Sequence, residues 1–383
     1  MKQLEAAKEV MQVFIDHGYD VYIVGGFVRD YVMGREGGDI DLASNATPEE
    51  VLSLFPQTVL TGVKHGTVSI LWGPYVFEVT TFRKEGTYRD YRWPDHVEYV
   101  DSFEEDVKRR DFTMNALGLA IDGTLVDYVG GVADIQKRII RTVGNPYERM
   151  KEDALRMLRA FRFVSTLDFT IHPDTLQAIR TLGHLMENIS QERIIEELKQ
   201  MLEGQAFLKA LKLMKETSFI KQLGFFEAGL ALCLDKSYQP ATFAEFLAVC
   251  TLFGDSKGLK QLPLAKKLVQ YVRRVVAFYR DCGKVHPWSL FTYGRDVVIT
   301  GNRIQHFIDG NPLLTDDINR LWSTLPIKSL KDLAVDGHDL MSWFDRKGGP
   351  WLNELLHRIA KAVITGEVKN ETDQIRHFLL KNK

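Results

Sequence analysis

Hydrophobic and polar positions divide the 383-residue chain into two parts with different periods. In residues 1–146, short apolar runs alternate with polar turns, which is the pattern of strands and short helices. From residue 147 onward, apolar residues recur at helical spacing almost to the end. The pattern therefore predicts an α/β N-terminal domain, a mixed sheet with helices, followed by an all-α C-terminal half.

One strand–turn–helix–strand unit is predicted over residues 21–42. The β-like run 21–24 stops at Gly25-Gly26, and the apolar spacing that follows predicts a short helix closed by Gly34. The first turn of such a helix has unpaired N–H groups and a partial positive charge, where a phosphate can bind. A second strand is predicted over residues 39–42.

The second predicted strand carries a pair of acids, Asp39 and Asp41. Alternate residues of a strand share a face, so these carboxylates would lie side by side, which is costly unless a cation joins them. Taken alone, a double glycine is usually only a turn, and such an acid pair is usually a solvated edge. Together they predict a phosphate site beside a divalent metal, as phosphoryl or nucleotidyl transfer requires.

Two further strands are predicted over residues 66–72 and 75–82, with Gly73-Pro74 as the turn between them. The alternation places Glu78 on the face opposite the apolar residues of the second strand. If that face adjoins the acid pair, Glu78 is a third acidic member of the site. An exposed glutamate on a sheet face is the other interpretation.

A basic and aromatic segment, residues 83–95, is predicted to be a loop because its glycine, proline and charges suit strand pairing poorly. It would suit contacts to single-stranded nucleic acid or to nucleotide phosphate, unless it is only a solvated loop. Farther on, one arginine of the run Lys108-Arg109-Arg110 could contact a triphosphate. Asp111 would then hold that guanidinium in place.

A helix is predicted over residues 152–163, on which Asp153 and Arg156 are neighbours at i and i+3. A structural salt bridge is the usual explanation of such a pair. The alternative is base recognition, because an ionised Asp only accepts hydrogen bonds and Arg only donates them. Cytosine and adenine each offer a donor beside an acceptor, whereas uracil and guanine offer the reverse. Such a pair could accept CTP and ATP and refuse UTP and GTP.

Composition narrows the class of protein. The chain has 26% charged and 45% hydrophobic residues, and its net charge of −2 excludes a protein that is basic throughout. Binding of nucleic acid would then depend on local basic groups, such as that between Arg149 and Arg162. The three cysteines lack the spacing of a zinc site or a disulfide framework. We find neither a secretory leader nor a membrane-length apolar run, so a cytoplasmic location is predicted.

The chain resembles the class II, bacterial-type tRNA nucleotidyltransferases, the CCA-adding enzymes of the DNA polymerase β superfamily. The resemblance extends over nearly the whole length, and its motifs follow in order: GGFVRD at 25–30, GDIDLA at 38–43, RRDFTMNA at 109–116, EDALRMLRAFRF at 152–163 and QERIIEEL at 191–198.

This resemblance implies an enzyme that builds or repairs the 3′-terminal CCA of tRNA from CTP and ATP, without a template and with Mg²⁺, as a monomer or homodimer. It implies a catalytic head (1–146), a neck for base recognition (147–205), a body (206–293) and a tRNA-binding tail (294–383). The implied site comprises the metal carboxylates Asp39 and Asp41, the nucleotide contacts Gly26, Arg29 and Arg110, and a base-selecting set, Asp153 and Arg156 with Arg159 and Arg162. From the residue pattern, Gly25 of the glycine turn joins the nucleotide-binding set and Glu78 is a catalytic helper.

Other activities share these motifs. A poly(A) polymerase, or an enzyme that adds only CC or only the terminal A, would keep the same chemistry. Relatives restricted to CC addition lack the family's flexible loop, which residues 83–95 match. The loop's presence therefore favours full CCA addition. A non-catalytic RNA-binding module is the remaining alternative, and the intact acid pair counts against it.

Overall fold

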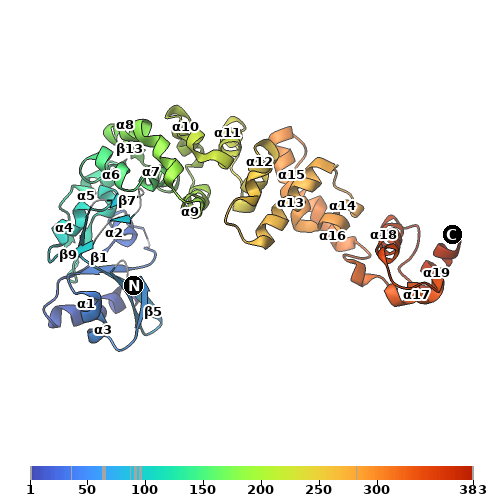
Figure 1. The fold of residues 1–383 in the computed structure, drawn as a ribbon, viewed down its shortest axis with the longest axis horizontal. Helices are drawn as coiled ribbons and strands as arrows, with labels where there is room; N and C mark the ends of the chain where they lie inside the picture. The colour runs from blue at the N-terminus through green and yellow to red at the C-terminus, as the bar shows by residue number, and fades with distance from the viewer. Residues whose placement is uncertain are drawn as a thin grey trace. The chain divides into compact units, whose positions relative to one another are not determined.

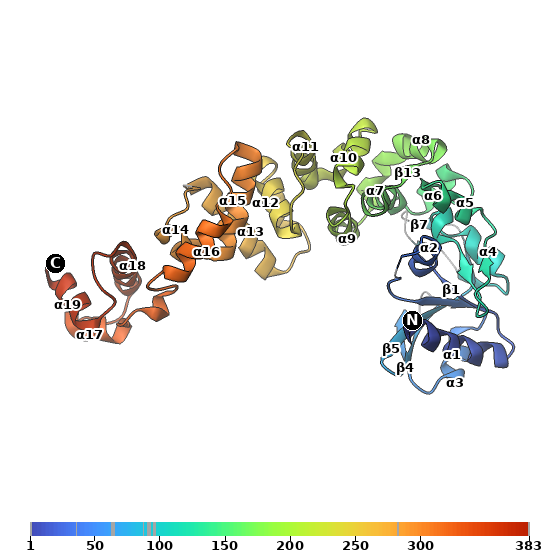
Figure 2. The same ribbon diagram turned by 180° about the vertical axis from the view of Figure 1, so that it is seen from behind.

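The computed structural model describes residues 2–35, 37–62, 66–86, 88–89, 93–94, 97–281 and 283–381. The chain forms two compact units, Met1–Glu227 and Ala228–Lys383, here called the first and the second unit (Figures 1 and 2). The finer division into head, neck, body and tail, with boundaries at 146, 205 and 293, stays a prediction.

A seven-stranded mixed sheet begins the first unit, with the strand order β11-β10-β1-β2-β5-β4-β3. Only β2 and β5 are parallel neighbours in it; the other described pairs are antiparallel. The mixed sheet with helices is therefore confirmed. The strands are β1 (Val21–Val24), β2 (Asp41–Ser44), β3 (Thr58–Gly62), β4 (Thr67–Trp72), β5 (Tyr75–Thr81), β10 (Gly118–Leu119) and β11 (Leu125–Val126).

Helices α1 (Lys2–Asp16) and α3 (Pro48–Leu54) lie side by side and cover one face of the sheet (Figures 1 and 2), with the rings of Phe14 and Phe55 5.1 Å apart. The start of α3 is fixed by a capping box, in which Thr47 and Glu50 bond each other's backbone amides. The covered face is the apolar one. Glu78 on β5 points to the opposite face, as its alternation with buried neighbours predicted.

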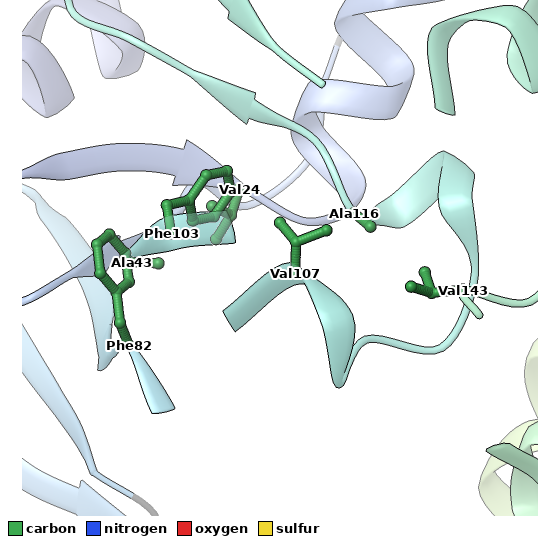
Figure 3. Close-up of a cluster of buried hydrophobic side chains, with 7 residues drawn as sticks. All are labelled: Val24, Ala43, Phe82, Phe103, Val107, Ala116 and Val143. Carbon is green, nitrogen blue, oxygen red and sulfur yellow. The ribbon is translucent and has the colours of Figure 1, made fainter. Parts of the chain in front are cut away.

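The core beneath the site joins the elements that carry it. Figure 3 shows this cluster of buried side chains, which come from six separate stretches of the first unit: Val24, Ala43, Phe82, Phe103, Val107, Ala116 and Val143. Val24 directly precedes the glycine turn, and Val107 directly precedes the basic run 108–110. The turn and the basic run are therefore fixed to one another through buried apolar contacts.

The basic segment after β5 is partly paired, so the prediction of an unpaired loop over 83–95 is wrong for its described residues. Two short ribbons form here, β6 (Arg83–Glu85) with β9 (Val97–Tyr99) and β7 (Tyr88–Arg89) with β8 (Trp93–Pro94). Each is only two or three residues long. A proline is tolerated in such a ribbon because an edge strand leaves half of its amides unpaired.

The rest of the first unit is helical except for a two-residue parallel pair, β12 (Ile139–Ile140) with β13 (Thr170–Ile171). Its other helices are α2 (Gly26–Val32), α4 (Phe103–Lys108), α5 (Gly131–Gln136), α6 (Pro146–Glu152), α7 (Leu155–Leu167), α8 (Pro173–Leu182), α9 (Gln191–Leu202) and α10 (Phe207–Glu216), with the 3₁₀ turns η2 (Thr113–Asn115), η3 (Gly183–Asn188) and η4 (Phe219–Phe226).

The second unit is all helical in its described residues, which confirms the predicted all-α C-terminal half. Its elements are α11 (Glu227–Asp235), α12 (Phe243–Phe253), η5 (Gly258–Lys260), α13 (Lys266–Asp281), α14 (Pro287–Tyr293), α15 (Arg295–Asp309), α16 (Thr315–Thr324), η6 (Leu330–Asp332), α17 (Gly337–Phe344), α18 (Pro350–Thr365) and α19 (Thr372–Lys381). Cys233 and Cys250 are buried free thiols, which agrees with the lack of a zinc or disulfide spacing in the sequence, and Cys282 lies outside the described residues. Every helix in the described ranges is too short or too polar to cross a membrane.

Candidate active site

The glycine turn lies between β1 and α2, where the sequence predicted it. Gly25 has φ 77° and ψ −145°, a conformation that side-chain-bearing residues rarely adopt, and α2 begins at Gly26. A Cβ atom at position 25 would lie 3.5 Å from Oδ2 of Asp41. The turn therefore brings bare backbone directly against the acidic strand.

The acid pair differs in detail from the prediction. Strand β2 begins at Asp41, so Asp39 lies in the exposed segment before it rather than on the strand. Asp41 and Glu78 are partners in the parallel register of β2 and β5. Both line a cavity of about 290 Å³, together with Arg110. Glu78 therefore lies opposite one member of the predicted pair, Asp41, and it is also an exposed residue of the sheet face, as the other interpretation had it. Its part in the chemistry stays a prediction.

Asp41 has an unusual acidity. Partial withdrawal from water, together with the negative charges of Glu78 and Asp39, raises the pKa of its carboxyl to about 6 against the opposing effect of Arg110. A carboxylate that resists ionisation because of its acidic neighbours is stabilised by a cation. These residues fit a divalent ion.

The described residues nevertheless hold no group of three or more His, Cys, Asp or Glu side chains gathered closely enough to bind a metal by themselves. This is the expected condition for Mg²⁺, which commonly takes one or two protein carboxylates and completes its shell with substrate phosphates and water.

A second cavity, of about 400 Å³, adjoins the first and is rich in guanidinium groups. The two cavities share three lining residues, Gly25, Asp41 and Arg110. Two arginines of α7 reach this second cavity from the helical region. Its lining brings together most of the predicted nucleotide-binding set: Gly25, Gly26, Arg29, Arg110, Arg159 and Arg162, with Asp41, Asp111, Asn115 and Phe163.

Arg110 is held by Asp106, so the prediction that Asp111 holds it is wrong. Oδ2 of Asp106 accepts from Nε and Nη2 of Arg110 at 3.1 and 2.9 Å, and Oδ1 accepts from Arg109. The reason is helical spacing: Asp106 lies near the end of α4, and Arg109 and Arg110 follow it at i+3 and i+4, just past the last helical residue. Burial alone would raise the pKa of Asp106, but the charges of both arginines outweigh it and the pKa lies below its usual value.

Asp111 holds Arg159 instead. Its Oδ2 accepts from Nε and Nη2 of Arg159 at 2.9 and 2.6 Å, while Nη1 donates to Oε1 of Glu197 on α9 at 3.2 Å. Asn115 links this pair to α2, the helix that follows the glycine turn, since its amide donates to Asp111 and its Oδ1 accepts from Arg29. The guanidinium groups of the cavity are thus connected through one polar network.

The other α7 arginine, Arg162, lies over the ring of Phe163, with its guanidinium carbon 3.8 Å from the ring centroid. It also pairs with Glu197, at 2.8 Å between Nε and Oε2. Burial and the adjacent charge of Arg159 lower the pKa of Arg162 to about 10. Such a partly desolvated cation binds an anionic ligand more strongly than a solvated one would.

The sequence predicted that Asp153 and Arg156 are neighbours on one helix. In the structure they are not paired with each other. Asp153 ends α6 with extended backbone angles, and its carboxylate accepts from both terminal nitrogens of Arg193 on α9, at 3.0 and 2.7 Å. Arg156 donates to Glu152 and to the backbone carbonyls of Arg149 and Arg109. Neither side chain lines the arginine-rich cavity, although the Arg109 carbonyl lies next to Arg110 in the chain.

Five residues of this arrangement were not in the predicted site: Asp106, Asn115, Phe163, Arg193 and Glu197. A signal existed for Asp106, whose distances of three and four residues from Arg109 and Arg110 are typical of helical ion pairs. The contacts of Arg193 and Glu197 join α9 to residues about 40 positions earlier, and no local pattern reveals them.

Comparison with known proteins defines the class first. Residues 21–141 match the family model described as "Poly A polymerase head domain", and residues 243–379 match that of tRNA nucleotidyltransferase domain 2. A model for an RNA-binding site of polymerase A matches residues 168–224. Fold, site and family models together define a nucleotidyltransferase.

Relatives then identify the family. CCA-adding enzymes of Anoxybacillus flavithermus and Geobacillus stearothermophilus are 38% and 39% identical to this chain, over 100% and 98% of its length and 98% and 96% of theirs. The crystal structure of the Bacillus stearothermophilus CCA-adding enzyme in complex with CTP is 36% identical and has a TM-score of 0.87, over 99% of this chain and 97% of that one. The chain belongs to the family of CCA-adding enzymes, which confirms the resemblance and implies dependence on a divalent metal.

Proposed function

We propose that this protein adds the 3′-terminal C, C and A of tRNA from CTP and ATP, in the cytoplasm. The observation that carries the proposal is the junction of the two cavities, where an acid wall and an arginine wall share Gly25, Asp41 and Arg110. A nucleoside triphosphate whose phosphates lie at this junction has its α-phosphate beside the carboxylates. The CTP complex named above supports CTP as a substrate, and the match to tRNA nucleotidyltransferase domain 2 supports tRNA.

In the proposed reaction the tRNA 3′-oxygen attacks the α-phosphorus of the bound nucleotide. A new phosphorus–oxygen bond forms, the bond to the bridging oxygen of the β-phosphate breaks, and pyrophosphate leaves. Asp39 and Asp41 would hold Mg²⁺, which activates the attacking oxygen and neutralises the leaving pyrophosphate. Glu78, opposite Asp41 in the sheet register, adds negative charge that attracts the cation.

Arg29, Arg110 and the amides of the Gly25-Gly26 turn are proposed to bind the triphosphate. Arg110 is directed by Asp106 and Arg29 by Asn115, so both guanidinium groups are positioned before the nucleotide arrives. Preorganised donors of this kind cost no reorganisation when charge develops in the transition state. Arg159 and Arg162 complete the cationic wall.

Asp153 and Arg156 are proposed to read the base. An ionised carboxylate has about four lone-pair sites, so Asp153 can accept from a base amino group while Arg193 occupies the others. On this proposal Arg193 is a positioning residue that fixes the direction of the Asp153 carboxylate at the break between α6 and α7. Its two parallel bonds give that fixation geometric specificity.

An incorporation assay tests the function. Purified protein is given each of the four α-labelled nucleotides with tRNAs that end before CCA, after C and after CC. We expect C on the first two, A on the third, and no U or G. Repeated A on all three would indicate a poly(A) polymerase, and C alone or A alone would indicate a partial activity. Tight tRNA binding without incorporation would indicate a non-catalytic RNA-binding module.

A further inference from the structure

The second unit contains a cavity of its own, of about 410 Å³, where α13, α14, α15 and α16 meet. It is larger than the acid-lined cavity of the first unit, at about 290 Å³, and lies within the volume range of ligand sites. Three aromatic and three charged side chains supply most of its lining: Tyr271, Tyr293, Trp322, Arg274, Arg295 and Asp296.

Two of its rings are fixed by their hydroxyl groups. Tyr271 bonds Thr300 Oγ1 at 2.8 Å and donates to the Asp296 carbonyl at 3.1 Å. The Tyr293 hydroxyl donates to Asp281, and its ring meets that of Phe278 edge to face. Rings that are held in this way lose little entropy when a flat ligand packs against them.

Trp322 is the aromatic residue of this cavity whose ring face is available for stacking. Its side chain is half-buried, and within the described residues its ring stacks on no other aromatic ring. The ring is approached by Lys328, whose ammonium lies 5.7 Å from the ring centroid. A half-buried indole with an unused face is a stacking surface for a nucleobase.

The charges at the rim favour an anion. Arg274 donates to the carbonyls of Thr292 and Tyr293 through Nη2, and among the described residues its Nε and Nη1 have no bonding partner. Arg295 pairs with Asp296 at 3.0 Å on the surface. The lining therefore has two positive charges and one negative charge, and α13 continues outward with exposed Lys266, Lys267 and Arg273.

We propose that this cavity binds one unstacked nucleotide of the tRNA, with the base on Trp322 and the phosphate near Arg274 and Arg295. The proposal rests on the proposed function and adds to it a tRNA contact made by the second unit, through residues other than those of the chemistry. Bases in a duplex stem are stacked and their faces are covered, whereas loop bases can leave the stack and lie on aromatic side chains. The nucleotide therefore comes from a loop of the tRNA rather than from the acceptor stem.

The test compares Trp322→Ala with the parent in steady-state CTP incorporation on two substrates, a full tRNA and an acceptor-stem hairpin without the tRNA loops. We expect the KM for tRNA to rise about 10-fold. The KM for the hairpin, the KM for CTP and kcat stay as in the parent. Trp322→Phe should restore most of the tRNA affinity, because it keeps an aromatic face.

Trp343→Ala is the matched control, since Trp343 is also half-buried, lies under Arg376 in the same unit and does not line the cavity. Arg295→Gln is a second variant at an exposed position, in case Trp322→Ala unfolds; it should weaken tRNA binding and lower the salt dependence by about one counterion. An unchanged KM for tRNA, or an equal rise for tRNA and hairpin, would overturn the proposal. A parent protein that adds no nucleotide would instead refute the proposed function.

Discussion

The two units of the chain use charge in opposite ways. The first has 27 Lys and Arg against 35 Asp and Glu, a net charge of −8, and the second has 22 against 16, a net charge of +6. Yet the first unit, acidic overall, contains the arginine-rich cavity. Its arginines are paired with buried acids, whereas most lysines and arginines of the second unit lie at the surface.

This difference indicates two roles for charge: buried ion pairs orient a side chain, and exposed charges attract a ligand. Burying an ion pair costs several kcal/mol per charge and contributes little net stability, so a buried network is retained where direction matters. Asp106, whose side chain is 1% exposed, directs Arg110 in this way. Exposed positive charge directs nothing in particular, but it attracts a polyanion such as tRNA at long range. Four predictions follow from this division, beginning with the largest effect.

Removal of the acid at the cavity junction should abolish chemistry and spare tRNA binding. We expect Asp41→Asn to lower the rate of CTP incorporation by about 10⁴-fold, which is about 5.5 kcal/mol, because the divalent ion loses a ligand. Single-turnover incorporation and tRNA binding, measured side by side, check this. Weakened tRNA binding with little loss of rate would break the division between the units.

Removal of a buried acid should cost more stability in the first unit than loss of an exposed one in the second. Asp106→Asn leaves two arginines without their counter-charge, and we expect a loss of about 3–5 kcal/mol in the free energy of unfolding. Asp317→Asn is the control, since its pair with Arg320 has side chains 50% and 78% exposed. That loss should stay below about 1 kcal/mol. Urea unfolding measures both, and equal losses would contradict the comparison.

Loss of the Arg193 contact should relax the choice of base. In Arg193→Gln the Asp153 carboxylate loses its bidentate partner, and we expect the preference for CTP over UTP to fall about 10-fold, or about 1.4 kcal/mol. The ratio of kcat/KM for the two nucleotides measures it. Lys199→Gln, on the same helix and paired with exposed Glu196, should leave the ratio unchanged. A fall in rate with full selectivity would assign Arg193 a structural role only.

The smallest expected effect is the change in the protein's stability with pH that Asp41 causes. The pKa of Asp41 is raised from 3.8 to about 6, so the folded protein binds this proton more tightly than the unfolded chain does. Its contribution to stability is present below pH 3.8 and is lost as the pH rises through about 6. At pH 8 without metal, Asp41→Asn or a divalent cation should each raise the unfolding temperature slightly, and at pH 4 neither should. Thermal unfolding at both values tests the sign.

Much of the local structure was predictable because it depends on neighbouring residues. The glycine turn, the capping box at Thr47 and the orientation of Glu78 follow from short patterns, and the structure contains all three. It was harder to predict that β2 and β5 lie side by side, because two other strands, β3 and β4, come between them in the sequence. The residue pattern joined the glycine turn to the acid pair, but it left open whether Glu78 lies beside them.

Side-chain pairing was the part that could not be predicted. Asp153 and Arg156 have ideal spacing for one helix, but the chain breaks between α6 and α7 at Asp153, and each side chain finds a partner elsewhere. Arginines have five donors and long side chains, so several acids compete for each of them. Which acid binds each arginine depends on distances between residues in the folded structure, which the local sequence does not reveal.

The closeness of Gly25 to Asp41 has a consequence for how the protein can change over generations. Any side chain at position 25 would be strained at φ 77°, and its Cβ would lie in van der Waals contact with the Asp41 carboxylate at 3.5 Å. Mutational drift is therefore opposed at position 25 by the backbone conformation and at position 41 by the need for a carboxylate in the proposed reaction. A library randomised at this pair should return almost nothing but the parental combination.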